Sequence, residues 1–247
     1  MSTEATTATD SHDGHDDGHG AVHDAGHDGA HGHAHPKWLA HHFDTPAKQF
    51  DTAKLGMWAF LIQELLFFSG LFVCYGIYRS WYPHMFVESS HQLNKLMGGA
   101  NTIVLLFSSL TAALAVRSSQ VGNKKATSRF LLITMVCACA FLVIKFFEYR
   151  HKFETGCLPG PYFHPHELSH GATLPGNAHI FYSIYFMMTG VHGVHVLIGI
   201  GVIFWIWRRN ERGDFSKEYF TPVDLVALYW HLVDLVWIYL FPLLYLI

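Results

Sequence analysis

The chain has 247 residues, 51% of them hydrophobic and 14% charged, and a formal net charge of −3 at pH 7. This composition excludes a basic nucleic-acid-binding protein, and the grouping of apolar residues in long blocks indicates a lipid environment. About 20 apolar residues cross the roughly 30 Å hydrocarbon core of a bilayer. The segments that reach this length are residues 56–78, 98–116, 130–149, 178–207 and 223–247. The pattern predicts an all-α, polytopic membrane protein with five transmembrane helices in a bundle.

Residues 1–42 form a separate region rich in His, Asp, Gly and Ala. Because this tail has almost nothing apolar to bury, we expect it to be disordered and residues 43–247 to form the membrane domain. Imidazole binds copper, zinc and nickel, so the tail is either a solvated spacer or a weak metal buffer. Its candidate ligands are His12, His15, His19, His23 and His27.

Glu64 lies inside the first apolar segment, within residues 63–68 (QELLFF). Ionisable side chains within a span are energetically expensive, so each one is a candidate functional position. Two interpretations of Glu64 stay open. It either hydrogen-bonds a neighbouring helix or takes part near a proton path.

The third segment contains Cys137 and Cys139, whose spacing suggests a metal pair. Residues two apart on a helix point to nearly opposite sides, so we expect both thiols to pack as small hydrophobic groups. Glu148 follows Lys145 by three residues, which favours an ion pair at the membrane interface. We expect the long stem of Lys145 to extend toward the lipid headgroups.

The connection from about residue 150 to residue 177 contains His164, His166 and His170. Pro165 would break any helix that aligned these side chains. A polar surface loop is therefore favoured over a metal site.

His192 and His195 lie one helical turn apart in the fourth segment. Gly190 and Gly193 share their neighbourhood and would let a second helix approach closely while the imidazoles bond across it. The pattern predicts a polar contact between helices at this level of the membrane.

His231 and Asp234 are likewise one turn apart in the fifth segment. Asp234 can hold the His231 ring or bond a partner on another helix. Heme ligation by His231 with His192 or His195 is the alternative, but the chain offers only one such pair. We therefore expect an interhelical polar network formed by His192, His195, His231, Asp234 and Glu148, and no firm metal site.

The orientation follows from the distribution of Lys and Arg around the spans. One side carries eleven of these residues: Lys37, Lys48, Lys54, Arg117, Lys124, Lys125, Arg129, Arg208, Arg209, Arg212 and Lys217. The other side carries four, Arg79, Lys95, Arg150 and Lys152. The positive-inside rule therefore predicts a cytoplasmic N-terminus.

Five motifs along the chain carry a family resemblance. They are residues 63–68 (QELLFF), 101–106 (NTIVLL), 148–149 (EY), 190–199 (GVHGVHVLIG) and 229–237 (YWHLVDLVW). In this order they resemble subunit III of cytochrome c oxidase, a heme-copper respiratory oxidase, in its five-helix bacterial form. The resemblance covers the chain from about residue 43 onward.

The resemblance implies a non-catalytic subunit of a proton-pumping terminal oxidase in the bacterial cytoplasmic (inner) membrane. In that family, heme a and copper belong to subunits I and II, whereas subunit III binds subunit I, holds phospholipid and supports proton uptake and complex stability. It implies no cofactor on this chain, a carbodiimide-reactive carboxyl group at Glu64, and a supercomplex with a cytochrome c-reducing complex as a further partner. The seven-helix form of the family has two additional N-terminal helices, in whose place this chain has the His-rich tail. Another subunit could supply those helices.

Three other functions stay open at this point. The chain could be an accessory subunit of a nitric oxide reductase or subunit III of a quinol oxidase. It could also be an independent transporter that uses Glu64, His192 and Asp234 as a proton relay.

Overall fold

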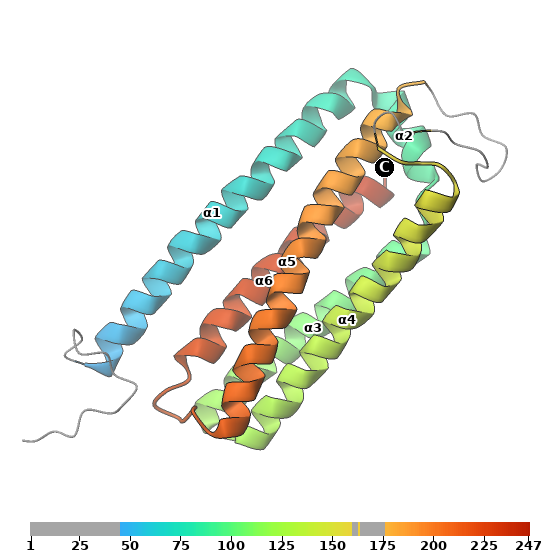
Figure 1. Cartoon of the computed structure of the whole chain (residues 1–247). Helices are drawn as coiled ribbons and strands as arrows, with labels where there is room; N and C mark the ends of the chain where they lie inside the picture. Colours follow the sequence, from blue (N-terminus) through green and yellow to red (C-terminus); the bar gives the residue numbers. More distant parts are fainter. Residues whose placement is uncertain (1–44, 160–162, 164–175) are drawn as a thin grey trace, which may run out of the picture. The chain divides into compact units, whose positions relative to one another are not determined.

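The computed structural model describes residues 45–159, 163 and 176–247. Over these residues the chain forms helices and no strand (Figure 1). The helices are α1 (Pro46–Trp81), α2 (Pro83–His91), α3 (Lys95–Val121), α4 (Lys124–Glu154), α5 (Ala178–Arg212) and α6 (Thr221–Tyr245). All of them belong to one compact unit, Lys37–Ile247.

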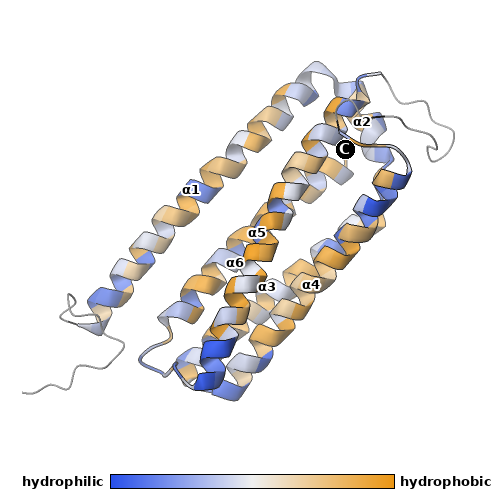
Figure 2. Ribbon diagram, viewed as in Figure 1, coloured by the Kyte–Doolittle hydropathy of each residue, from blue (hydrophilic) through white to orange (hydrophobic). Residues whose placement is uncertain are grey.

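Five of these helices are long and apolar enough to cross a membrane, namely α1, α3, α4, α5 and α6. This confirms the predicted all-α fold with five transmembrane helices. Helices α1, α3, α4 and α5 are each longer than the apolar segment predicted for them, since each includes polar turns at its ends. Figure 2 shows this as hydrophilic turns at the end of α4 and of α5. Gly213, with φ of 84°, terminates α5 in a left-handed conformation that glycine adopts without steric cost.

Helix α2 was not expected, because the hydropathy pattern predicts only a connection between residues 78 and 98. It has nine residues, too few for a recognisable apolar segment, and begins at Pro83, a favoured first position of a helix. Met85 and Phe86 are buried, and the Phe86 ring meets Phe181 of α5 edge to face, with 5.3 Å between centroids. Helix α2 therefore covers one end of the bundle.

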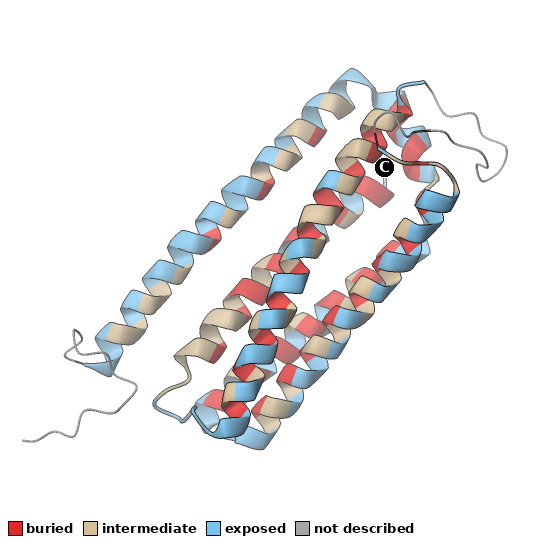
Figure 3. Cartoon of the chain, in the orientation of Figure 1, coloured by how far each residue is buried: buried red, intermediate tan, exposed pale blue. Residues whose placement is uncertain are grey.

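Helix α6 is the most buried of the spans and packs against α1, α3 and α5 (Figure 3). Trp230 and Trp237 lie two turns apart on it, and both have no exposed surface. Their indole nitrogens donate to Ser108 Oγ at 2.8 Å and Thr102 Oγ1 at 3.1 Å, both on α3. A buried indole N–H usually finds an acceptor, and these two bonds fix how α3 and α6 face each other.

Gly199 of α5 lies directly against a side chain of α6. A Cβ atom there would lie 2.7 Å from Trp230 Cζ3, whereas a Cβ at Gly193 would meet nothing within 4 Å and one at Gly190 only Tyr149 Oη at 3.9 Å. The prediction of close helix contact at Gly190 and Gly193 was therefore wrong. The large indole ring of Trp230 lies against Gly199, about two turns after Gly193 on α5. It leaves no room for a side chain at Gly199.

Helix α1 shows mostly exposed or half-buried positions in Figure 3. Its buried residues are Leu61, Phe68 and Tyr75, which are spaced seven residues apart. This spacing places them on one narrow stripe of the helix, which packs mainly against α6. The same stripe brings Glu64 to the inner side of α1.

Candidate functional site

Glu64 of α1 contacts His195 of α5 in the middle of the spans. Glu64 Oε2 lies 3.0 Å from His195 Nε2, and each side chain is 15% exposed. His195 Nδ1 lies 2.8 Å from the backbone oxygen of Val191, one turn earlier. A carbonyl oxygen only accepts, so Nδ1 carries a hydrogen.

The hydrogen on Nδ1 determines what the Glu64–His195 contact can hold. A neutral imidazole then accepts at Nε2 from a protonated carboxyl group, whereas an imidazolium donates from Nε2 to a carboxylate. Both forms place one proton between the two residues. The pair can therefore hold a proton and pass it between oxygen and nitrogen.

Aromatic rings flank this pair. The His195 ring has Phe68 and Phe67 of α1 at centroid distances of 5.0 Å and 6.2 Å. Tyr229 of α6 donates to the backbone oxygen of His195 at 3.0 Å. Contacts from α1, α5 and α6 therefore position His195. Among the side chains around its ring, Glu64 is the polar one and Phe67 and Phe68 are apolar.

His192 has different neighbours from His195, although the two lie one turn apart. It has no exposed surface, and its ring packs on Trp237 and Phe141 at 5.3 Å and 5.5 Å between centroids. Neither ring nitrogen has a hydrogen-bond partner among the described residues. The two histidines that the spacing groups together therefore do not share a partner.

His231 contacts α3 rather than Asp234. Its Nδ1 atom lies 2.7 Å from Ser109 Oγ. Asp234 is 2% exposed, and neither of its carboxyl oxygens has a hydrogen-bond partner in the described part of the chain. Asp234 nevertheless faces Ser108 and Ser109 of α3, so both members of the predicted pair lie against that helix, and only His231 makes a hydrogen bond of normal geometry to it.

Glu148 belongs to a buried cluster that also includes Lys145 and Tyr245. Lys145 Nζ donates to Glu148 Oε2 at 2.9 Å and to Tyr245 Oη at 2.7 Å, while Tyr245 donates to Glu148 Oε1 at 2.5 Å. The Lys145 ammonium also lies 4.6 Å from the Trp237 ring centroid. The side chain of Lys145 is 9% exposed and that of Glu148 is 3% exposed.

The inward direction of Lys145 corrects one sequence expectation. Its side chain does not extend toward the headgroups, because Glu148 and Tyr245 offer it a countercharge and an oxygen acceptor inside the bundle. Arg150, the other base near Glu148, pairs instead with Glu154 at 2.8 Å. The ion pair of Lys145 with Glu148 was expected from their spacing, but its burial was not.

The residues that complete these contacts carry little signal in the sequence. Ser109 is one of several small polar residues in α3, and Tyr245 lies 97 residues from Glu148. Isolated hydroxyl groups are common in apolar segments, so only the three-dimensional arrangement selects these two. The i, i+3 spacing of Lys145 and Glu148 was the single local clue.

No group of three His, Cys, Asp or Glu side chains within the described ranges could hold a metal ion. Cys137 is half-buried and Cys139 is exposed, and both are free thiols. The tail candidates His12, His15, His19, His23 and His27 lie outside the described residues, as do the loop residues His164, His166 and His170. Of the intramembrane imidazoles, His195 and His231 each have a polar partner, and His192 has aromatic rings around it.

The family described as cytochrome c oxidase subunit III matches residues 169–247 of this chain. The chain is 32% identical over 198 residues to cytochrome c oxidase subunit 3 of Synechocystis sp., covering 80% of this chain and 76% of that protein. It is 32% identical to cytochrome c oxidase subunit 3 of Corynebacterium diphtheriae, covering 78% of this chain and 87% of that protein. A probable cytochrome c oxidase subunit 3 of Mycobacterium leprae is 31% identical over the same shares. With its five membrane-spanning helices, the chain belongs to the cytochrome c oxidase subunit III family.

Proposed function

We propose that this multi-pass membrane protein is the non-catalytic subunit III of a proton-pumping heme-copper oxidase. In this proposal it binds subunit I, supports proton uptake and maintains the stability of the complex. The observation that carries the proposal is the 3.0 Å contact between Glu64 Oε2 and His195 Nε2, in a chain whose family is shown by its relatives.

The position of Glu64 supports a role in proton uptake. A carboxyl group inside an apolar span is energetically expensive, so its presence there favours a functional role. Its side chain is 15% exposed, so the pair stays accessible from one flank of α1 while His195 is held by Val191 and Tyr229. A fixed imidazole next to a partly accessible carboxyl group is suited to exchange of one proton.

The remaining features of the proposal concern the complex around the chain. Heme a and copper are in subunits I and II, and this chain holds no redox centre. We infer that phospholipid binds the chain, that the N-terminus is cytoplasmic and that the complex lies in the bacterial inner membrane. Cytochrome c is the proposed electron donor, in keeping with the names of the relatives. A supercomplex with a cytochrome c-reducing complex remains part of the same proposal.

Deletion of the chain tests the supporting role. The oxidase without this chain should keep its heme content but turn over more slowly or inactivate during turnover. Glu64→Gln should also keep the heme content and reproduce part of this loss, because the amide cannot exchange the proton. Glu88→Gln, at an exposed position of α2, is the matched control and should leave turnover unchanged.

The readouts are the optical spectrum, the rate of oxygen consumption and its decay with time. An unchanged turnover lifetime in the complex that lacks this chain would contradict the proposal. Proton transport by the purified chain alone in liposomes would favour an independent transporter instead.

A further inference from the structure

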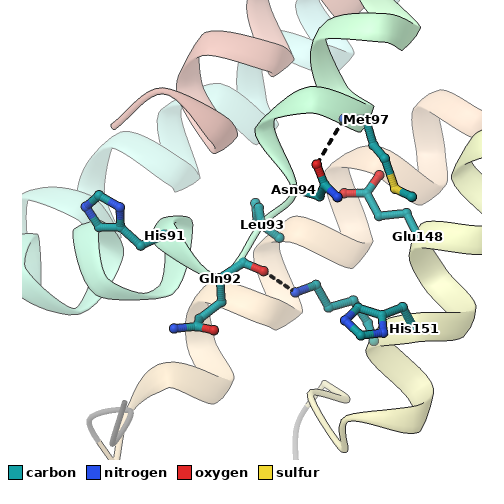
Figure 4. A pocket seen from close by; sticks show the side chains of 8 residues that line it. His91, Gln92, Leu93, Asn94, Met97, Glu148 and His151 are labelled. Carbon is teal, nitrogen blue, oxygen red and sulfur yellow. Dashed lines mark hydrogen bonds between the residues drawn. The ribbon is translucent and has the colours of Figure 1, made fainter. Parts of the chain in front are cut away.

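A cavity of about 400 Å³, lined mainly by polar residues, lies between the start of α3 and the end of α4. Figure 4 shows Glu148 and His151 of α4 on one side of it and the connection from α2 to α3 on the other. The cavity is lined by His91, Gln92, Leu93, Asn94, Met97, Glu148, His151 and Lys152. The Glu64–His195 pair is not part of it.

The charge in this cavity favours an anion. The carboxylate of Glu148 is already matched by Lys145 at 2.9 Å and receives the hydroxyl of Tyr245. Lys152 forms no ion pair with a described residue, and its ammonium uses one of its three N–H groups on the backbone oxygen of Gln92, at 2.6 Å. The ammonium also lies 5.8 Å from the centroid of the Tyr182 ring, which carries no charge, so the positive charge of Lys152 remains for a ligand.

The two histidines add further donors at the rim of the cavity. His91 and His151 are exposed, and each imidazole carries at least one N–H group. Lys152 is 4% exposed, so it supplies a charge that is little screened by solvent. This combination of a buried ammonium and two accessible imidazoles matches the oxygens of a phosphate group.

An apolar groove of about 330 Å³ continues from the cavity along α3 and α4. Asn94 and Met97 line both, so the two spaces are adjacent. The rest of the groove is formed by Leu96, Ala100, Ile144 and Phe147. From Asn94 to Ala100 it follows α3 for about 9 Å at the rise of an α-helix, enough for the first carbons of an acyl chain.

We propose that the cavity and the groove together bind one phospholipid. Its phosphate lies among His91, His151 and Lys152, and the beginning of one acyl chain lies along the groove beside Ala100. The site is at the ends of membrane-spanning helices, the depth at which lipid headgroups reside. A free phosphate would explain the cavity but not the adjoining apolar groove.

The site assigns specific residues to the lipid binding proposed above. It rests on the proposed function in one respect: the test uses the oxidase complex that contains this chain. The oxidase assignment is tested by subunit composition and turnover, whereas this site is tested by bound lipid. The failure of one is therefore distinguishable from the failure of the other.

The test is native mass spectrometry of the intact complex, purified in mild detergent with the full-length chain. The double variant His91→Ala/His151→Ala should lower the occupancy of one phospholipid about tenfold or more, because hydrogen bonds to a charged group are lost. Ala100→Trp fills the groove and should have the same effect independently. His84→Ala on α2 and Ile103→Trp on α3 are exposed controls outside the site and should retain this lipid.

Three outcomes would overturn the proposal. The first is equal phospholipid retention in all variants. The second is loss of an adduct with the mass of inorganic phosphate in place of a lipid. The third is loss of a bound peptide or protein from the two site variants, since this would identify a different occupant.

Discussion

Removal of the Lys145 ammonium should strongly destabilise the bundle. In Lys145→Met the carboxylate of Glu148, with a side chain 3% exposed, loses the countercharge that lies 2.9 Å away. Breaking a buried pair by removing one partner costs about 3–5 kcal/mol. Tyr245 still donates to Glu148 Oε1, so we expect the lower end of this range, about 3 kcal/mol.

The double variant Lys145→Met/Glu148→Leu should be more stable than the single variant. It removes both charges and leaves the Tyr245 hydroxyl without its two partners in the cluster, at a cost of about 1 kcal/mol. The double variant should therefore recover about 2 kcal/mol relative to Lys145→Met. Lys125→Met, at an exposed position of the same helix, is the control and should stay within about 0.5 kcal/mol of the parent.

The assay is the free energy of unfolding of the purified chain in mixed micelles, measured by circular dichroism. A double variant less stable than Lys145→Met would refute the reasoning, because the cost would then not arise from an uncompensated charge. Equal effects of the changes at Lys145 and Lys125 would refute the inward placement of the Lys145 ammonium.

Two further predictions concern α5 and α6. Gly199→Ala should lower the free energy of unfolding by about 1–3 kcal/mol, because its Cβ would lie 2.7 Å from Trp230 Cζ3, while Gly201→Ala meets nothing within 4 Å and should have little effect. His231→Ala should cost about 1–3 kcal/mol by leaving the Ser109 hydroxyl without its partner, and the optical spectrum of the oxidase should keep its hemes. A smaller effect of Gly199→Ala than of Gly201→Ala would contradict the first prediction, and loss of a heme would contradict the second.

The helix content was predictable because lipid imposes a simple constraint on the sequence. A span must be apolar over about 20 residues, so the hydrocarbon portions of the five long helices appear directly in the hydropathy pattern. The short α2 did not appear, because nine residues at the end of a bundle need only a few buried side chains such as Phe86. The helix ends also differed, because capping and turn geometry rather than hydropathy terminate a helix.

The candidate site was predictable only as a set of residue types. The sequence by itself identified Glu64, His195 and Glu148 as costly polar groups, because each stands inside a long apolar segment. Which groups meet was decided by the tertiary structure: Glu64 reaches His195 across 131 positions of sequence, and Tyr245 reaches Glu148 across 97. Hydrogen bonds act over about 3 Å, so these pairings depend on how each helix is rotated and how deep it lies in the bundle. Packing against neighbouring helices sets both, and the sequence of one helix does not.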